Sequence, residues 1–138
     1  MKKIILFIFI IPLFSFGQSE VKLEYWDNGN ILSQVHYVDG VRDGSCRNYH
    51  KNGILMDEGF YKDGKMTGIW ISYYDNGQTR VQGKYNHENK NVNSERIGTW
   101  VEYYTDGKIA IESTIIDGKE NRKYFNQDGS ENTNPSGC

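Results

Sequence analysis

The sequence predicts an all-β protein, an elongated single antiparallel sheet of consecutive β-hairpins. A motif of an aromatic residue followed closely by Asn-Gly or Asp-Gly recurs along the chain, and Gly29, Gly53 and Gly77 lie 24 residues apart. Between these glycines lie short runs rich in aromatic and β-branched residues, as in the strands of hairpins. No segment has the sustained apolar period of 3.6 residues that an amphipathic helix would show.

Five related stretches define the repeat unit. Four align without gaps and the last carries one extra residue: YWDNGN (25–30), YHKNGI (49–54), YYDNGQ (73–78), YYTDGK (103–108) and YFNQDGS (124–130). Gly77 and Gly107 lie 30 residues apart, so one copy carries a short insertion, which falls within the polar segment 86–96. We therefore expect one domain over residues 18–130, with about four to five repeats and about nine strands of roughly six residues.

Two sets of dipeptides are expected to close the hairpins as two-residue turns with positive φ at both central residues. They are Asn28-Gly29, Asn52-Gly53 and Asn76-Gly77 at one end of the strands, and Asp39-Gly40, Asp63-Gly64 and Asp117-Gly118 at the other. Both prolines lie outside the repeats, which fits a sheet whose strands keep all their N–H donors.

Equivalent side chains of successive repeats are expected to stack in columns across the sheet, and aromatic columns of this kind stabilise a repeat array. Neither face of the expected strands is wholly apolar, so the sheet should be partly wetted on both sides. The columns are Tyr49, Tyr73 and Tyr103; Trp70 and Trp100 with Cys46 in the equivalent place; and Tyr37, Tyr61 and Tyr85, continued by Ile115.

The first 17 residues have the layout of a secretory signal peptide. Lys2 and Lys3 precede an apolar run over residues 4–14, and small residues stand at Ser15 and Gly17, before an expected cut at Gln18. The run is too short for a membrane helix. Residues 1–17 are thus expected to be cleaved and the protein to be periplasmic or secreted, while residues 131–138 form a polar C-terminal tail.

Charge and cysteine content narrow the function classes. The chain has a net charge of −2, with both signs interspersed and no basic block. This argues against nucleic acid as a partner, and it gives no charge-based support for binding a membrane surface. Cys46 and Cys138 are the only cysteines and do not make a disulfide framework; whether they pair stays open.

The residues also carry a family resemblance. The pattern Y-x-[ND]-G, followed by Y-x-x-G-x-x-x-G-x-W-x-x-Y-Y-x-[ND]-G, resembles the MORN-repeat variant of bacterial proteins described as toxin–antitoxin system YwqK family antitoxins. The resemblance covers residues 25–129, and residues 61–77 are its best copy. It implies a MORN-like array that binds a protein partner, with an antitoxin or immunity role as one option. Since the chain is expected to be exported, the toxin that an antitoxin of this kind neutralises would act in the envelope.

A second resemblance leads to the alternative function. The stretch GKMTGIW followed by YYDNG is similar to choline- or glucan-binding cell-wall repeats, in which aromatic side chains of neighbouring hairpins surround a ligand. This resemblance implies recognition of a cell-wall component or glycan through the aromatic columns, with cation–π contacts where the ligand is a quaternary ammonium group.

No motif in the sequence predicts catalysis. His36, His50 and His87 have no metal-ligand spacing, and the Asp-Gly and Asn-Gly pairs lack the alternating acidic ligands of a calcium loop. Nucleophile-elbow, zinc-protease and phosphate-loop motifs do not occur. We therefore expect a protein that is not an enzyme and has no cofactor or metal, and whose histidines lie in strands (His36, His50) or in the polar loop (His87).

The candidate binding residues are aromatic or lie in the insertion. The equivalent positions His50, Tyr74 and Tyr104 follow each strand next to the turn, where a partner could reach them, since Tyr anchors interfaces well. Trp70 and Trp100 have two interpretations: they stabilise the sheet by packing between hairpins, or they form part of a recognition surface. His87 lies in segment 86–96, which is either a solvated insertion or an element that determines specificity.

Overall fold

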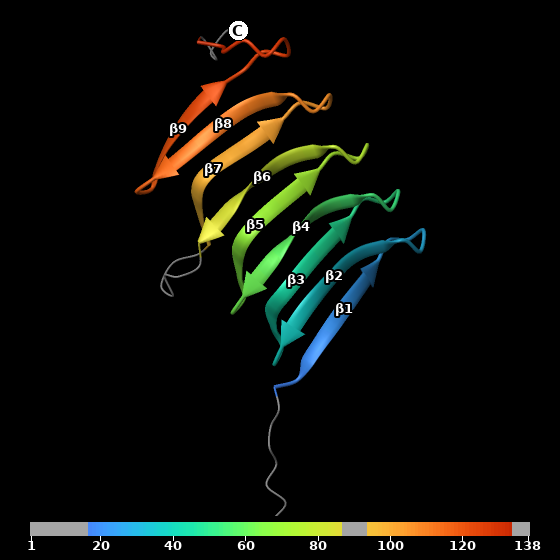
Figure 1. The fold of residues 1–138 in the computed structure, drawn as a ribbon. Coiled ribbons are helices and arrows are strands. Elements are labelled where there is room, and N and C mark those ends of the chain that lie inside the picture. The colour runs from blue at the N-terminus through green and yellow to red at the C-terminus, as the bar shows by residue number, and fades with distance from the viewer. Residues whose placement is uncertain (1–16, 87–93, 134–138) are drawn as a thin grey trace, which may run out of the picture.

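The structure, a computed structural model, describes residues 17–86 and 94–133, and these residues form one open antiparallel sheet. The strands pair in chain order, β1 through β9, so every connection is a hairpin (Figure 1). The predicted all-β class and single sheet of consecutive hairpins are confirmed. The strands are β1 (Ser19–Tyr25), β2 (Ile31–Val38), β3 (Val41–Tyr49), β4 (Leu55–Lys62), β5 (Lys65–Tyr73), β6 (Thr79–Asn86), β7 (Glu95–Tyr103), β8 (Ile109–Ile116) and β9 (Lys119–Tyr124).

Several sequence-based expectations lie outside the described residues. They concern the signal segment up to residue 16, His87 and the rest of 87–93, and the tail from 134 to Cys138. Within residues 17–86 and 94–133, the structure contains no helix long and apolar enough to cross a membrane.

The Asp-Gly turns form as predicted. Asp39, Asp63 and Asp117 have φ near +50° and the glycine after each is also positive, the backbone of a two-residue type I′ turn. Its twist matches that of the flanking strands, and Asp tolerates the left-handed region better than most residues.

The prediction of the same two-residue turn at the Asn-Gly pairs is wrong. Of each pair only the glycine has positive φ, as at Gly77 with +85°. Gly77 N donates to the Tyr74 carbonyl and Tyr74 N donates to the Gln78 carbonyl, which closes a three-residue loop, a type I turn followed by a left-handed glycine. The asparagine instead uses its side chain, since Asn76 Oδ1 accepts from Gln78 N over 3.0 Å.

One face of the sheet carries an interleaved row of aromatic rings, here called the aromatic ladder: Tyr61, Trp70, Tyr85 and Trp100. Successive rings meet edge to face, with centroids 5.3, 6.3 and 5.0 Å apart. Such pairs contribute about 0.5–1.5 kcal/mol beyond the area they bury. Two of the predicted columns therefore merge into one ladder that crosses four strands. Arg96 extends it, with its guanidinium 4.1 Å from the Trp100 ring centre.

Trp70 and Trp100 each lie on a glycine of the strand before them. A Cβ on Gly59 would overlap the Trp70 ring, and a Cβ on Gly83 would overlap the Trp100 ring. Trp70 Nε1 also donates to the Phe60 carbonyl over 3.2 Å. The bare backbone thus covers the indole, which is why both tryptophans are buried in a sheet without a second layer.

In the first repeats, the equivalent contact has a residue smaller than tryptophan on one strand and a residue larger than glycine on the other. Cys46 occupies the tryptophan position, and Val35, which pairs with it, occupies the glycine position. Both are buried and join Trp70 in one cluster. The residue on the preceding strand is thus larger where the residue at the tryptophan position is smaller.

Exchanging these residues singly should therefore destabilise the protein, and exchanging them together should not. Cys46→Trp alone overpacks the site against Val35 and should lower the free energy of unfolding by about 1–3 kcal/mol. The double variant Cys46→Trp, Val35→Gly should recover most of this loss. Urea denaturation of the two single variants and the double variant measures the coupling. Additive losses would contradict the pairing.

Candidate functional site

Side chains alternate between two faces of the sheet, and the faces differ in content. The ladder face carries Tyr61, Trp70, Tyr85 and Trp100, and the opposite face, here called the open face, carries Phe60, Ile69 and Ile71. In the described part of the chain, the continuous row of ring contacts lies on the ladder face, so the two faces can serve different purposes.

The positions singled out beside the turns hold neighbouring repeats together. Tyr74 donates its hydroxyl to the Tyr103 carbonyl over 2.6 Å, and Tyr104 donates to the Phe125 carbonyl over 2.8 Å. His50 Nε2 lies 3.3 Å from the Tyr73 carbonyl oxygen. The expectation that His50 lies within a strand is wrong: it lies one residue beyond β3, where the chain turns.

Trp26 occupies the same place in the first repeat and donates Nε1 to the Tyr49 carbonyl over 2.9 Å. The four residues at this position, which are a tryptophan, a histidine and two tyrosines, thus all contact a backbone carbonyl of the next repeat. Their polar atoms are engaged within the sheet, which supports a stacking role for them; a role in recognition stays a prediction.

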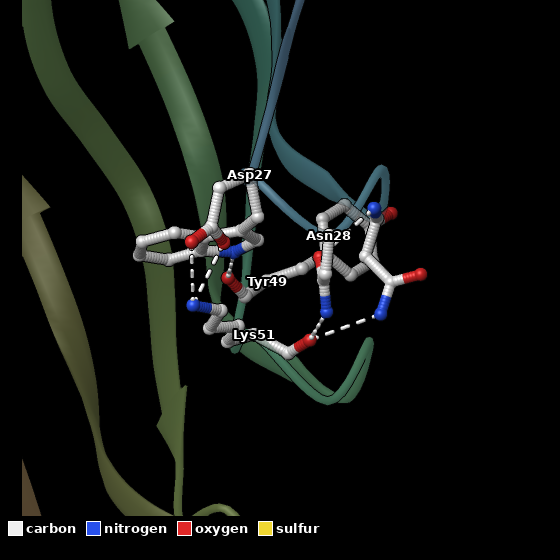
Figure 2. A network of polar contacts seen from close by, with 6 residues as sticks. Asp27, Asn28, Tyr49 and Lys51 are labelled. Atoms are coloured by element: carbon white, nitrogen blue, oxygen red, sulfur yellow. Dashed lines mark hydrogen bonds and ion pairs between the residues drawn. The ribbon is translucent and has the colours of Figure 1, made fainter.

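The turns beside these residues also bond to each other. In Figure 2, Asn28 donates Nδ2 to the Lys51 carbonyl over 2.9 Å, and Lys51 Nζ lies 2.7 Å from an Asp27 carboxylate oxygen. Asn52 Nδ2 repeats the asparagine contact with the Asp75 carbonyl over 3.2 Å. The turn asparagine therefore makes two kinds of hydrogen bond, one within its own loop and one to the loop of the next repeat.

Trp70 and Trp100 do come together, as lining of a depression of about 250 Å³ on the ladder face. Asn48, Asp57 and Ser72 line it too, and Asn48 Nδ2 donates to Asp57 Oδ1 over 2.6 Å. The two tryptophans are only 8% and 6% exposed. Neither ring offers an open flat surface to a ligand, and their main contacts are with the sheet itself.

The open face carries an apolar patch that the sequence analysis did not single out. Phe60 is 55% exposed and Ile69 is 64% exposed, although both lie in central strands. With Ile71 they line a depression of about 240 Å³. Exposed large apolar side chains that gather beside a depression mark interaction sites.

Charged side chains border this patch. Arg47 Nε lies 3.3 Å from Glu58 Oε2, and both residues line the same depression. Tyr73 donates its hydroxyl to Glu58 Oε1 over 3.1 Å. Burial, followed by this bond to a carboxylate, raises the pKa of Tyr73 above its usual value. An apolar centre with a polar rim is the usual anatomy of a protein interface.

A comparison between repeats would have revealed the patch. Phe60 corresponds to His36 and Lys84 in the neighbouring repeats, and Ile69 corresponds to Ser45 and Thr99. Only one repeat is apolar at both positions, whereas the ladder positions stay aromatic through several repeats. Residues that recur serve the array, and residues that differ on an exposed face are free to serve a partner.

The ionisable groups form no metal site in residues 17–86 and 94–133, where no cluster of three or more His, Cys, Asp or Glu residues could hold an ion. Cys46 is a buried free thiol. Burial is the main cause that raises the pKa of the Cys46 thiol above its usual value.

A single sheet of tandem hairpins with a ladder on one face defines a β-hairpin repeat protein. The MORN repeat variant family matches residues 21–39, 42–63, 66–87 and 96–117, and the chain belongs to this family. Each matched segment spans two successive strands, one hairpin closed by an Asn-Gly or Asp-Gly loop. A comparison with curated proteins gave no match.

The stacking role of Tyr74 is testable without removing its ring. Tyr74→Phe keeps the aromatic surface and loses the bond to the Tyr103 carbonyl, so it should lower the free energy of unfolding by about 0.5–1.5 kcal/mol. Tyr25→Phe, which alters an exposed hydroxyl on the edge strand, is the matched control and should change it little. Equal stabilities of wild type and Tyr74→Phe in urea denaturation would contradict the role.

Cys46 should be unreactive in the folded protein. Its thiol is buried and its pKa is raised, so little thiolate is present or accessible at pH 8. In a Cys138→Ser background, iodoacetamide labelling followed by mass spectrometry should detect modification of Cys46 only after denaturation in urea. Rapid labelling under native conditions would show that the first repeats open readily.

Proposed function

We propose that the chain is a non-catalytic protein-binding module that docks its partner on the open face, over Phe60, Ile69 and Ile71. The observation that carries the proposal is the exposure of Phe60 and Ile69 in the middle of the sheet, beside a depression of about 240 Å³. Membership of a repeat family supports it, because repeat arrays present extended surfaces to partners.

The chemistry of the patch indicates what the partner presents. An aliphatic or aromatic side chain fills the depression, and its burial against Phe60 and Ile69 supplies the affinity. Arg47 and Glu58 lie at the rim and bond polar groups around that anchor. Lys84 pairs with Ile69 across the strands and is exposed, so an acidic group of the partner fits beside it.

Within this proposal, residues 1–17 act as an export signal, so the partner lies in the bacterial envelope or outside the cell. An antitoxin or immunity function toward an envelope-acting toxin is one form of it. Glycan recognition is the alternative, but the burial of Trp70 and Trp100 leaves little ring surface for stacking a sugar. Protein docking is therefore the function that the geometry favours.

A pull-down from an envelope extract with residues 18–138 tests the proposal. Ile69→Lys should weaken capture of the partner at least about tenfold, because a charge replaces the apolar anchor. Ile116→Lys is the matched control: Ile116 is 66% exposed, lies in β8 far from the patch, and should leave capture unchanged.

The readout is one protein band, identified by mass spectrometry and then titrated in purified form. The proposal requires that the wild type and Ile116→Lys retain it and that Ile69→Lys loses it. If the wild type and both variants retain the partner equally, the patch does not take part in docking and the proposal is wrong. Retention of peptidoglycan or polysaccharide with no protein would favour the glycan alternative.

A further inference from the structure

The first strand presents an open edge to solvent. All seven residues of β1 are exposed, and in the described chain β2 is its only neighbour. The Gln18 carbonyl and both backbone groups of Trp26 bond toward the β2 side. Backbone groups alternate in direction along a strand, so Val21, Leu23 and Tyr25 turn their N–H and C=O groups outward.

The opposite edge of the sheet is protected. Of the six residues of β9, Lys119, Glu120, Arg122 and Lys123 are charged, which discourages the approach of another strand. At the end of β9 the chain folds back on itself, since Asn132 N donates to the Tyr124 carbonyl over 2.7 Å. Of the two edges that the described strands form, β1 is therefore the one that suits a strand partner.

We infer that β1 pairs antiparallel with β1 of a second copy of this chain, with Leu23 opposite Leu23. In this register Val21 lies opposite Tyr25 of the second copy, and the reverse. Lys22 lies opposite Glu24, so each charge meets its opposite on both sides of the two-fold axis. A register centred on Lys22 would instead place lysine against lysine and Glu20 against Glu24.

The two-fold axis runs perpendicular to the sheet, so equivalent faces of both copies point the same way. Val21, Leu23 and Tyr25 share the open face, where they are 45%, 45% and 58% exposed. Pairing brings the three residues of each copy together in one apolar cluster. The Lys22–Glu24 pairs form on the ladder face, where Lys22 Nζ now lies 3.2 Å from a Glu20 oxygen.

This pairing is closed and symmetric, so it stops at a dimer. Pairing of β1 with β9 of the next copy would instead give an open-ended polymer. The charges of β9 and the segment that folds back at its end oppose this pairing. The dimer doubles the sheet and aligns two open faces, so one assembly offers two equivalent binding surfaces.

Sedimentation velocity over a range of concentrations tests the inference on residues 18–138, which contain all nine strands. The wild type should show a monomer–dimer equilibrium. Leu23→Pro removes an outward N–H that β2 does not use, so the monomer should stay folded by circular dichroism while the dimer is lost. Lys22→Glu should weaken the dimer about tenfold, through two like-charge contacts.

The double variant Lys22→Glu, Glu24→Lys restores opposite charges in this register and should return the dimer to near wild-type affinity. A monomer at every concentration would overturn the inference, as would a dimer that survives Leu23→Pro or a double variant no better than the single one. A dimer lost in Ile69→Lys but not in Leu23→Pro would place the contact on the open face and also overturn it.

Discussion

The structure depends on one constraint: a single sheet has no second layer against which to bury its aromatic side chains. The indoles of Trp70 and Trp100 are nonetheless buried, because each lies on the backbone of the preceding strand at a glycine. A methyl group at Gly59 or Gly83 would lift the ring away from the sheet. The absence of a side chain is therefore as necessary to this core as the tryptophan is.

This kind of burial makes stability a property of neighbouring repeats. Trp70 meets Tyr61 on one side and Tyr85 on the other, and Tyr85 meets Trp100 in turn. At the turns, Tyr74 and its equivalents bond a carbonyl of the following repeat. Both contacts link adjacent hairpins, so the array is stabilised by a sum of nearest-neighbour terms. Neither kind of contact involves the side chains of Phe60 and Ile69. These two side chains are therefore free to meet a partner.

The sequence predicted the strands well, because hairpin signals are local. Asp63-Gly64 turned as expected, whereas Asn76-Gly77 did not, because an Asn-Gly pair fits both a two-residue turn and the last two residues of a three-residue loop. The aligned repeats show that valine and cysteine at 35 and 46 replace the glycine and tryptophan found at 83 and 100. That the two positions contact each other follows only from the pairing of the strands. The repeat pattern does not predict the patch at Phe60, because a repeat identifies residues that recur, while a partner surface consists of residues that do not.

The ladder also explains why the array accepts an insertion. Segment 86–96 interrupts the repeat spacing between β6 and β7, yet Tyr85 still pairs with Arg96, and the Tyr85 and Trp100 rings stay 5.0 Å apart. The contact that couples the two hairpins lies within the strands and does not pass through their connection. Added loop length costs only a small closure entropy as long as that contact forms. In such an array the connections can change length while the ladder keeps the register.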